Sequence, residues 1–376
     1  MGYVATIGGE IAIEEALKRL TYERLKDERS LATQDMIAGM PRLIDIIMSE
    51  ASLYDRPLAA IALKQAQGLP EEAVFLLRAY RSTLPRLATT QPLQPSSMTT
   101  IRRISASFKE IPGGQFLGGT PDYTHRLLDQ KLAEETHADA QKFVAAYRAQ
   151  CEEGFDPTHD RIDTNPLIFP EKVHAMLPSI QAVKKVGSPR NAFIDLTREP
   201  PKFPLPRSGR LQLLTRGQTG AVIAFAYALQ RSFGELHPTV GELRVGQLTL
   251  TVPSPWPDET EGDDAYTIGD ILVTEVETFF PTANLHGSGE KEHALAIGYG
   301  FCFGQNESKA IAMSMLDFAL RHPHPEYPST QEEFVLYHID TLEASGFIAH
   351  LKLPHYVTFA SLIDTLSKGE EKGHDA

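Results

Sequence analysis

The hydrophobic periodicity of the chain changes once, and this change constrains the fold more than any other feature. Over residues 10–87 apolar side chains recur at spacings of three and four, as in I-A-I-E-E-A-L-K-R-L and E-E-A-V-F-L-L-R-A-Y-R-S-T-L. That spacing is typical of amphipathic helices. Pro41 and Pro57 suit the first turns of further helices, and Gly68 suits a helix end. The first part of the chain is therefore predicted to form a helical bundle.

Downstream of a turn-rich linker at residues 91–100 the pattern becomes mixed. Alternating apolar and polar residues predict strands, whereas three- and four-residue spacing predicts the helices between them. The expected elements are a strand beginning I-R-R-I-S-A-S-F, a helix begun by Pro121, two helices over residues 209–233, strands over residues 243–252, 271–279 and 293–303, and a helix capped by Asn306.

These patterns define a fold class and a division of the chain. We predict an α+β protein, with a helical N-terminal region (residues 1–90) followed by a mixed α/β region (residues 101–376) built on an antiparallel or mixed sheet. A chain of 376 residues exceeds the usual ceiling for one hydrophobic core. Two domains, or one domain with large additions, are therefore expected.

Charge and cysteine content exclude several function classes. The net charge is -13 and no long basic run occurs, which disfavours nucleic-acid binding. Part of the acidic excess lies in residues 258–264 and in the C-terminal tail, both predicted to be solvated loops. Cys151 and Cys302 are the only cysteines, too few for a disulfide framework. The longest apolar run, at residues 221–229, is too short to span a bilayer, and no secretory signal is recognisable, so we expect a cytoplasmic protein.

Two histidines bracket the apolar segment F-I-A-H-L-K-L-P-H-Y near the C-terminus. Alternation predicts a strand here, after a helix that Gly346 ends. On a straight strand His350 and His355 would point to opposite sides, about 16 Å apart. They could share a metal ion only if the chain bends at Leu353 and Pro354. Exposed or internally bonded histidines are the commoner alternative.

The glycine-rich loop I-P-G-G-Q-F-L-G-G-T precedes Asp122, Tyr123, His125 and Arg126. Its backbone N–H groups and the start of the helix expected at Pro121 could bind a phosphate. A tight turn explains the same glycines, and the loop matches neither a dinucleotide-binding fingerprint nor a Walker loop. A second segment, G-Y-G-F-C-F-G-Q-N-E-S-K, offers glycines and Lys309, with strand bulges as the alternative.

Other charged residues are weaker candidates. The arginine pairs could clamp phosphates, with surface ion pairs as the alternative. Glu275 and Glu277 share one face of a predicted strand and could act as acid or base, although such pairs are usually solvated. The histidines of H-P-H-P are expected in an exposed loop. The arginines are Arg102, Arg103, Arg207 and Arg210, and the histidines are His322 and His324.

Several segments together resemble the PhnI family, subunits of the bacterial carbon-phosphorus lyase core complex. They span nearly the whole chain in order, apart from residues 130–191 and the acidic tail. The segments are A-L-K-Q-A-Q-G, F-L-L-R-A-Y-R, I-P-G-G-Q-F-L-G-G-T-P-D-Y-T-H-R-L-L-D, S-G-R-L-Q-L-L-T-R-G, I-G-Y-G-F-C-F-G and E-E-F-V-L-Y-H-I-D-T-L-E-A-S-G-F-I-A-H-L-K-L-P-H-Y.

The resemblance implies phosphonate catabolism, the recovery of phosphate from compounds with a carbon-phosphorus bond. It implies a purine nucleosidase acting on ATP and GTP. With PhnG, PhnH and PhnL partners, a phosphonate would displace adenine from Mg-ATP to give alpha-D-ribose 1-methylphosphonate 5-triphosphate. Carbon-phosphorus cleavage would belong to PhnJ, a radical iron-sulfur enzyme, which agrees with the two cysteines here. PhnK is the remaining candidate partner.

The resemblance also implies a metal site. The family's H-L-K-L-P-H segment supplies two histidine ligands to a zinc ion near the PhnJ interface, and the matching positions are His350 and His355. A Zn²⁺ ion shared with a partner subunit is therefore expected.

Roles in glycosidic cleavage follow by analogy. An oxocarbenium-like transition state needs a carboxylate near the ribose and an acid near the purine, for which Asp122 and His125 are the candidates. The triphosphate is expected to be held by arginines and glycine-loop amides, namely Arg103, Gly113, Gly114 and Arg126.

Two alternatives stay open. A free-standing zinc hydrolase would use the same two histidines and a third protein ligand, for which His338 is nearest in sequence. A non-catalytic scaffold would keep its apolar interfaces and lose nothing when His350 is replaced.

Overall fold

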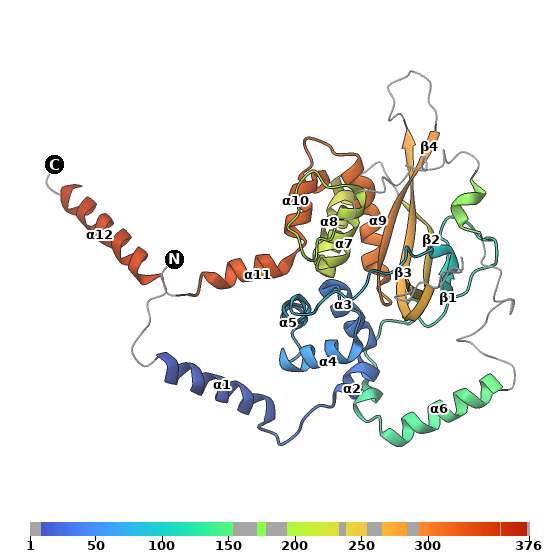
Figure 1. The fold of residues 1–376 in the computed structure, drawn as a ribbon, viewed down its shortest axis with the longest axis horizontal. Helices are drawn as coiled ribbons and strands as arrows, with labels where there is room; N and C mark the ends of the chain where they lie inside the picture. Colours follow the sequence, from blue (N-terminus) through green and yellow to red (C-terminus); the bar gives the residue numbers. More distant parts are fainter. Residues whose placement is uncertain are drawn as a thin grey trace, which may run out of the picture.

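The structure is a computed structural model that describes residues 9–152, 171–177, 194–232, 238–253, 265–283, 293–353 and 355–373. A helical N-terminal part is followed by a four-stranded antiparallel sheet with helices, as the sequence predicts. Figure 1 shows a central body from which several helices extend. The predicted solvated loop at residues 258–264 lies outside the described residues.

Five helices occupy the N-terminal part of the chain and confirm the helical prediction. Pro41 lies in the first turn of the third helix, Pro57 in that of the fourth, and Gly68 has a left-handed φ of 89° just after the fourth. Four of the helices pack around one core that includes Ile44 and Leu63. The five are α1 (Gly9–Leu25), α2 (Thr33–Gly39), α3 (Pro41–Ala51), α4 (Arg56–Gln65) and α5 (Pro70–Ser82).

The sheet has the strand order β1-β2-β3-β4, and every neighbouring pair is antiparallel. It confirms the predicted strands and the antiparallel form of the predicted sheet. The strands are β1 (Thr99–Ile104), β2 (Thr239–Pro253), β3 (Ala265–Ala283) and β4 (His293–Phe303), and the short helix η1 (Pro95–Ser97) precedes the first.

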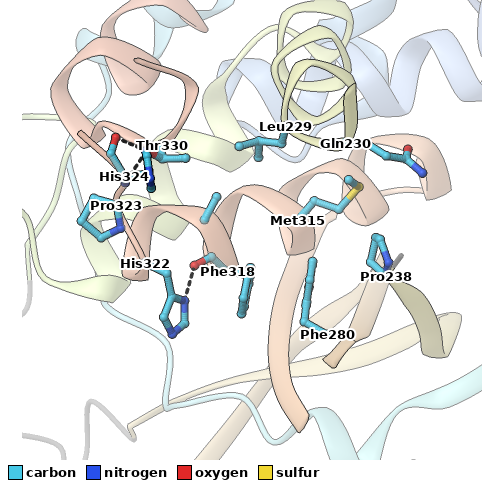
Figure 2. A pocket seen from close by; sticks show the side chains of 11 residues that line it. Leu229, Gln230, Pro238, Phe280, Met315, Phe318, His322, Pro323, His324 and Thr330 are labelled. Carbon is cyan, nitrogen blue, oxygen red and sulfur yellow. Dashed lines mark hydrogen bonds between the residues drawn. The ribbon is translucent and has the colours of Figure 1, made fainter. Parts of the chain in front are cut away.

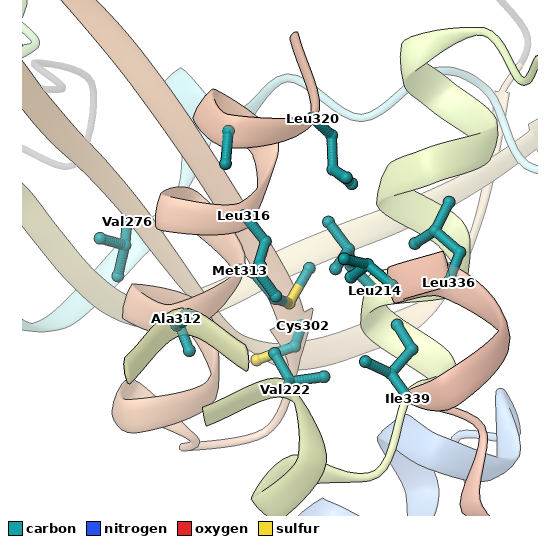
Figure 3. Close-up of a cluster of buried hydrophobic side chains, with 14 of the residues drawn as sticks. Leu214, Val222, Val276, Cys302, Ala312, Met313, Leu316, Leu320, Leu336 and Ile339 are labelled. Atoms are coloured by element: carbon teal, nitrogen blue, oxygen red, sulfur yellow. The ribbon is translucent and has the colours of Figure 1, made fainter. Parts of the chain in front are cut away.

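One face of the sheet is covered by α9 (Glu307–Arg321), whose Asn306 cap accepts the N–H of Lys309 as expected. The same apolar core includes α7 (Arg207–Arg216), α8 (Thr219–Ser232) and α10 (Glu332–His338). Figure 3 shows Leu316 and Met313 of α9 meeting Leu214 and Val222 there. This core covers one face of the sheet, so the opposite face makes its contacts with other parts of the chain.

The N-terminal helices dock onto the sheet region through partly buried polar contacts. The Arg78 guanidinium donates to Asp340 at 2.8 Å, the Thr219 N–H donates to Glu50 at 2.8 Å, and the Gln305 N–H donates to Asp45 at 3.0 Å. The predicted boundary after residue 90 thus marks a change of secondary structure across which contacts are made. The division of the chain into two domains stays a prediction.

Several helices extend away from this body (Figure 1). No residue of α1 or α11 is buried, although both carry large apolar side chains. The extended helices are α1, α6 (His137–Glu152), α11 (Thr341–His350) and α12 (Tyr356–Gly373), and the remaining short helices are η2 (Gln130–Ala133), η3 (Val173–Met176) and η4 (Pro328–Thr330).

Three predictions of local structure are wrong. The first part of the segment expected as a strand, residues 347–350, belongs to α11 and residues 351–353 form a turn, so Gly346 lies inside a helix and does not end one. No helix begins at Pro121, where the chain forms turns and irregular loop until η2. The acidic tail continues α12 to Gly373, and residues 374–376 lie outside the description. In the described part of the chain, no helix has both the length and the apolar character needed to cross a membrane.

Gly300 allows β4 and α9 to approach closely. A Cβ atom at this position would overlap the carbonyl oxygen of Ala310 in α9. We expect Gly300→Ala to lower the free energy of unfolding by about 1–3 kcal/mol, because α9 must move off the sheet. Urea unfolding followed by circular dichroism measures this. Gly39→Ala is the matched control, since its Cβ atom would enter open space; equal midpoints in the two variants would contradict the prediction.

Candidate functional site

His350 and His355 lie together at the junction of α11 and α12. Their Nε2 atoms are 3.1 Å apart and their rings meet edge to face with centroids 4.6 Å apart. Sequence reasoning separated the two side chains because it treated the segment as a straight strand. In the structure His350 ends α11, a turn follows, and His355 precedes α12, which brings both rings to one side. The bend predicted at Pro354 falls on a residue outside the description.

This geometry fits a metal ion bound by both Nε2 atoms. Two nitrogens about 2.05 Å from one tetrahedral ion lie roughly 3.3 Å apart. The Nδ1–H of His355 donates to the Leu353 carbonyl at 2.5 Å. A carbonyl can only accept, so this bond fixes the tautomer that leaves the Nε2 lone pair of His355 available to a metal.

The remaining ligands do not come from nearby side chains of the described chain. No group of three potential ligands from His, Cys, Asp or Glu occurs among the described residues. His338, the predicted third ligand of a free-standing hydrolase, instead contacts the Phe334 carbonyl within α10 through Nδ1 at 2.6 Å. Any ion held by His350 and His355 therefore needs water, substrate, a partner residue or a residue outside the described ranges to complete its coordination.

The glycine-rich loop forms a tight turn. Gly113 has a φ of 76°, follows Pro112, and lies within a turn closed by the Gly114 N–H donating to the Ile111 carbonyl at 2.9 Å. Proline followed by a residue with positive φ is the signature of a type II turn. Because no helix starts at Pro121, the predicted contribution of a helix N-terminus to phosphate binding is absent. Binding of phosphate by Gly113 and Gly114 stays a prediction.

Asp122, His125 and Arg126 lie on an exposed loop. Asp122 accepts from the buried guanidinium of Arg102 at 2.5 Å, and Arg102 also contacts Glu307 of α9 at 3.0 Å. The Arg126 side chain is 68% exposed, so it is open to an anion. Within the part of the chain that the structure describes, no hydrogen bond joins Asp122 to His125. Their proposed roles stay predictions.

Arg103 lies on the face of the sheet opposite α9 and is fully buried. Its Nε donates to Glu242 at 2.7 Å, and its two Nη atoms donate to the carbonyls of Pro112 and Glu171. The expectation of a surface ion pair is wrong for both Arg102 and Arg103. The bonds of Arg103 hold the glycine turn beside the segment that leads into η3.

Glu275 and Glu277 are also buried, against the expectation of a solvated pair. They share one strand face, as predicted, because both are on β3 with one residue between them, and this face is also the one that carries Arg103. Lys172 bridges them, with its ammonium 2.7 Å from Glu275 and 3.0 Å from Glu277. The His174 imidazole donates through Nδ1 to Glu277 at 2.8 Å. We call Arg103, Lys172, His174, Glu242, Arg244, Glu275, Glu277 and Tyr299 the charged face.

Electrostatics of the charged face favour the ionised forms of Glu277 and His174 and the neutral form of Tyr299. Burial alone would raise the pKa of Glu277, but the hydrogen bond from His174 and the charge of Lys172 outweigh it and lower that pKa to about 2. The hydrogen bond to Glu277 raises the pKa of His174 despite its partial burial. Burial and the nearby Glu275 carboxylate raise the pKa of Tyr299 well above its ordinary value.

Sequence reasoning missed Lys172 and His174. Both lie in a stretch that has no periodic pattern or motif, and their partners on β3 are about a hundred residues away in sequence. The one signal in the sequence was the placement of Glu275 and Glu277 on one strand face. If such a face is buried, the two carboxylates need basic partners.

The H-P-H-P histidines line a cavity of about 360 Å³ between α8, α9 and the start of β2. Figure 2 shows its apolar floor, where Phe280 and Phe318 stack with ring centroids 4.0 Å apart. The Nδ1–H of His322 donates to the Phe318 carbonyl at 2.8 Å. Both histidines are half-buried, so the expectation of an exposed loop is corrected.

The other basic candidates are engaged inside the protein. Lys309 is buried and donates to the carbonyls of Thr215 and Gly217, which satisfies the end of α7. Arg207 forms a bidentate pair with Asp317 at 2.9 and 2.7 Å. Neither side chain offers an unoccupied phosphate clamp.

Comparison with known proteins gives concordant results over the full length. The model of the family described as "Bacterial phosphonate metabolism protein (PhnI)" matches residues 2–372. Alpha-D-ribose 1-methylphosphonate 5-triphosphate synthase subunit PhnI of Rhizobium meliloti is 39% identical, covering 100% of this chain and 96% of the relative. The protein of the same name from Escherichia coli is 40% identical over 99% of each. A putative C-P lyase subunit protein HtxH of Stutzerimonas stutzeri is 40% identical, covering 99% of this chain and 97% of the relative.

Proposed function

The chain belongs to the PhnI family of bacterial phosphonate metabolism proteins, and on that premise we propose that it is a subunit of alpha-D-ribose 1-methylphosphonate 5-triphosphate synthase. The observation that carries this proposal is the similarity to two synthase subunits of that name over essentially the whole of each chain. The product name requires a phosphonate joined to C1 of a ribose triphosphate. Displacement of the base from a nucleoside triphosphate supplies such a ribose.

Within this proposal, the chain itself breaks the bond between the purine and the ribose of Mg-ATP. Water is the nucleophile for the chain alone, and a phosphonate replaces it in the assembled complex. Two places in the structure carry groups suited to this step: the exposed loop with Asp122 and Arg126, and, on the other face of the sheet, the charged face beside the glycine turn. These features agree with glycosidic cleavage, which needs acids, carboxylates and bound phosphates.

We expect the full-length chain to release adenine from ATP without any phosphonate. Adenine and ribose 5-triphosphate should form in equal amounts, because water takes the place of the base at C1. Chromatography of the products with inorganic phosphate measured in parallel tests this. A mixture of ADP and phosphate as the main products would indicate an ATPase and contradict the assignment.

A zinc ion shared with a partner is the second part of the proposal. His350 and His355 would hold it through Nε2, as their 3.1 Å separation allows. Bound there, zinc would act as a Lewis acid toward a phosphonate or phosphate oxygen. The Leu353 carbonyl keeps His355 in the required tautomer.

The extended helices are the proposed docking surface for the other subunits. Apolar side chains on α11 and α12 lie exposed on either side of the histidine pair, so a PhnJ-like subunit that completes the zinc site would also cover them. PhnG-, PhnH- and PhnL-like subunits, and PhnK, are the other proposed partners. The exposed side chains include Phe347, Ile348, Leu351, Phe359, Leu362 and Leu366.

We expect the chain expressed alone to self-associate, and co-expression with the partner subunits to prevent this. The reason is the large apolar area that α1, α11 and α12 expose. Size-exclusion chromatography with light scattering compares the two preparations. A stable monomer that the partners leave unchanged would contradict the docking proposal.

A further inference from the structure

His174 combines a fixed orientation with an accessible nitrogen. Its Nδ1–H donates to the buried Glu277 carboxylate at 2.8 Å. The described part of the structure contains no hydrogen-bond partner for its Nε2, and the side chain is 40% exposed. A histidine held by a carboxylate on one nitrogen and open on the other is the arrangement of a general acid or base.

The surroundings of His174 keep that orientation. The Val173 N–H donates to Glu242 at 3.2 Å, which ties the start of η3 to β2. Lys172 bridges Glu275 and Glu277 and so fixes the carboxylate that holds the imidazole. The glycine turn is joined to the same segment through Arg103.

The charged groups around His174 favour the protonated, imidazolium form of its side chain. The titratable and charged groups that act on His174 are Glu277 of β3, Glu242 of β2 and Lys172 of its own segment. The hydrogen bond and the charge of Glu277 raise the pKa of His174, whereas burial and Lys172 oppose this. Across the charged face, Arg103, Lys172 and Arg244 balance the three glutamates, so a protonated His174 adds one positive charge.

We propose that His174, positioned by Glu277, is the general acid that protonates the departing purine base. This inference rests on the proposed nucleosidase activity. As the bond between ribose C1 and purine N9 breaks, the electron pair stays on the purine, and the His174 Nε2–H passes its proton to purine N7. Water attacks C1 and loses a proton, and the neutral imidazole regains one from solvent.

The histidine pair of the extended helices does not compete for this role. In Figure 1, α11 extends to the left of the body, whereas β1 and β2 lie on its right, and the Val173 N–H ties η3 to Glu242 of β2. The sheet separates the charged face from Asp122, because Arg102 and Arg103 are adjacent on β1 and project to opposite faces.

The test compares GTP with N7-methylguanosine triphosphate, whose base is already cationic and leaves without an acid. In the full-length chain, His174→Gln should reduce guanine release from GTP by about 10²–10⁴-fold. Release of the N7-methylated base should fall by less than about threefold. His137→Gln, on the exposed α6, is the matched control and should match the unmodified chain on both substrates.

The pH profile gives a second readout. With GTP, the rate should fall as pH rises through the pKa of His174, because the acid form is lost. Glu277→Gln replaces the carboxylate that raises this pKa with a neutral amide, so the fall should move to lower pH.

Three outcomes overturn the proposal. The first is an equal loss of the rate of base release from both substrates in His174→Gln. The second is an unchanged pH profile in Glu277→Gln. The third is a selective loss of GTP cleavage in His125→Gln while His174→Gln stays fully active. Absence of base release from the unmodified chain would instead contradict the nucleosidase activity itself, so the two failures are distinguishable.

Discussion

His350→Ala and His355→Ala should each remove zinc from the co-purified complex and abolish phosphonate-dependent release of adenine, while the complex stays assembled. Each variant deletes one of the two Nε2 ligands that this chain offers. Loss of residues that only support a metal ligand already costs about 10–100-fold in affinity, so loss of a ligand should cost more. Neither histidine belongs to an apolar core, so the fold should survive.

Metal analysis of the purified complexes by mass spectrometry measures the zinc content, and size-exclusion chromatography reports assembly. His338→Ala is the control, because the hydrogen bond and the ring contact that this histidine makes with Phe334 lie within α10. Full zinc occupancy in both His350→Ala and His355→Ala would show that these residues are not ligands. Loss of assembly together with zinc would indicate a structural site.

In the mixed α/β region, the positions of helices and strands could be predicted from the sequence wherever one face of the element is buried in the core. In β4, Cys302 is buried on the face toward α9 while its neighbours alternate, and Asn306 supplies a recognisable cap. Burial of one face imposes the period that sequence reasoning detects. The bounds of β4 and the start of α9 agree with the predicted segments for that reason.

For the extended helices, the same reasoning from periodicity gave a wrong prediction. Phe347 and Ile348 of α11 and Leu351 just after it are all exposed, so no core of this chain sets their spacing. A strand-like alternation could therefore occur by chance in a helix. If a partner covers these residues, their pattern reflects that partner's surface, which the sequence of one chain does not contain.

The charged face was only half predictable. Glu275 and Glu277 were recognised as sharing a strand face, but their burial depends on Lys172 and His174, which lie about a hundred residues earlier. Buried carboxylates need basic partners, yet the sequence does not say which distant residues supply them. These partners can be identified only from the three-dimensional structure.

Arg103→Met should destabilise the chain by about 3–5 kcal/mol, the usual cost of leaving a buried charge without its partner. Arg103 is fully buried, and its removal would strand Glu242 and two carbonyls that it now satisfies. Arg126→Met is the matched control, because that guanidinium is largely exposed and should change stability by less than about 0.5 kcal/mol. Urea unfolding of the full-length chain measures both.

The double variant Arg103→Met with Glu242→Met separates a structural role of Arg103 from the predicted role in triphosphate binding. Removing both members of a buried pair should recover much of the stability lost in the single variant, because no uncompensated charge remains. If Arg103 served only the substrate, the single variant would instead raise KM for ATP and keep the unfolding midpoint of the unmodified chain. The bonds of Arg103 to Glu242 and to the glycine turn favour the first result, with substrate contact left to the exposed Arg126.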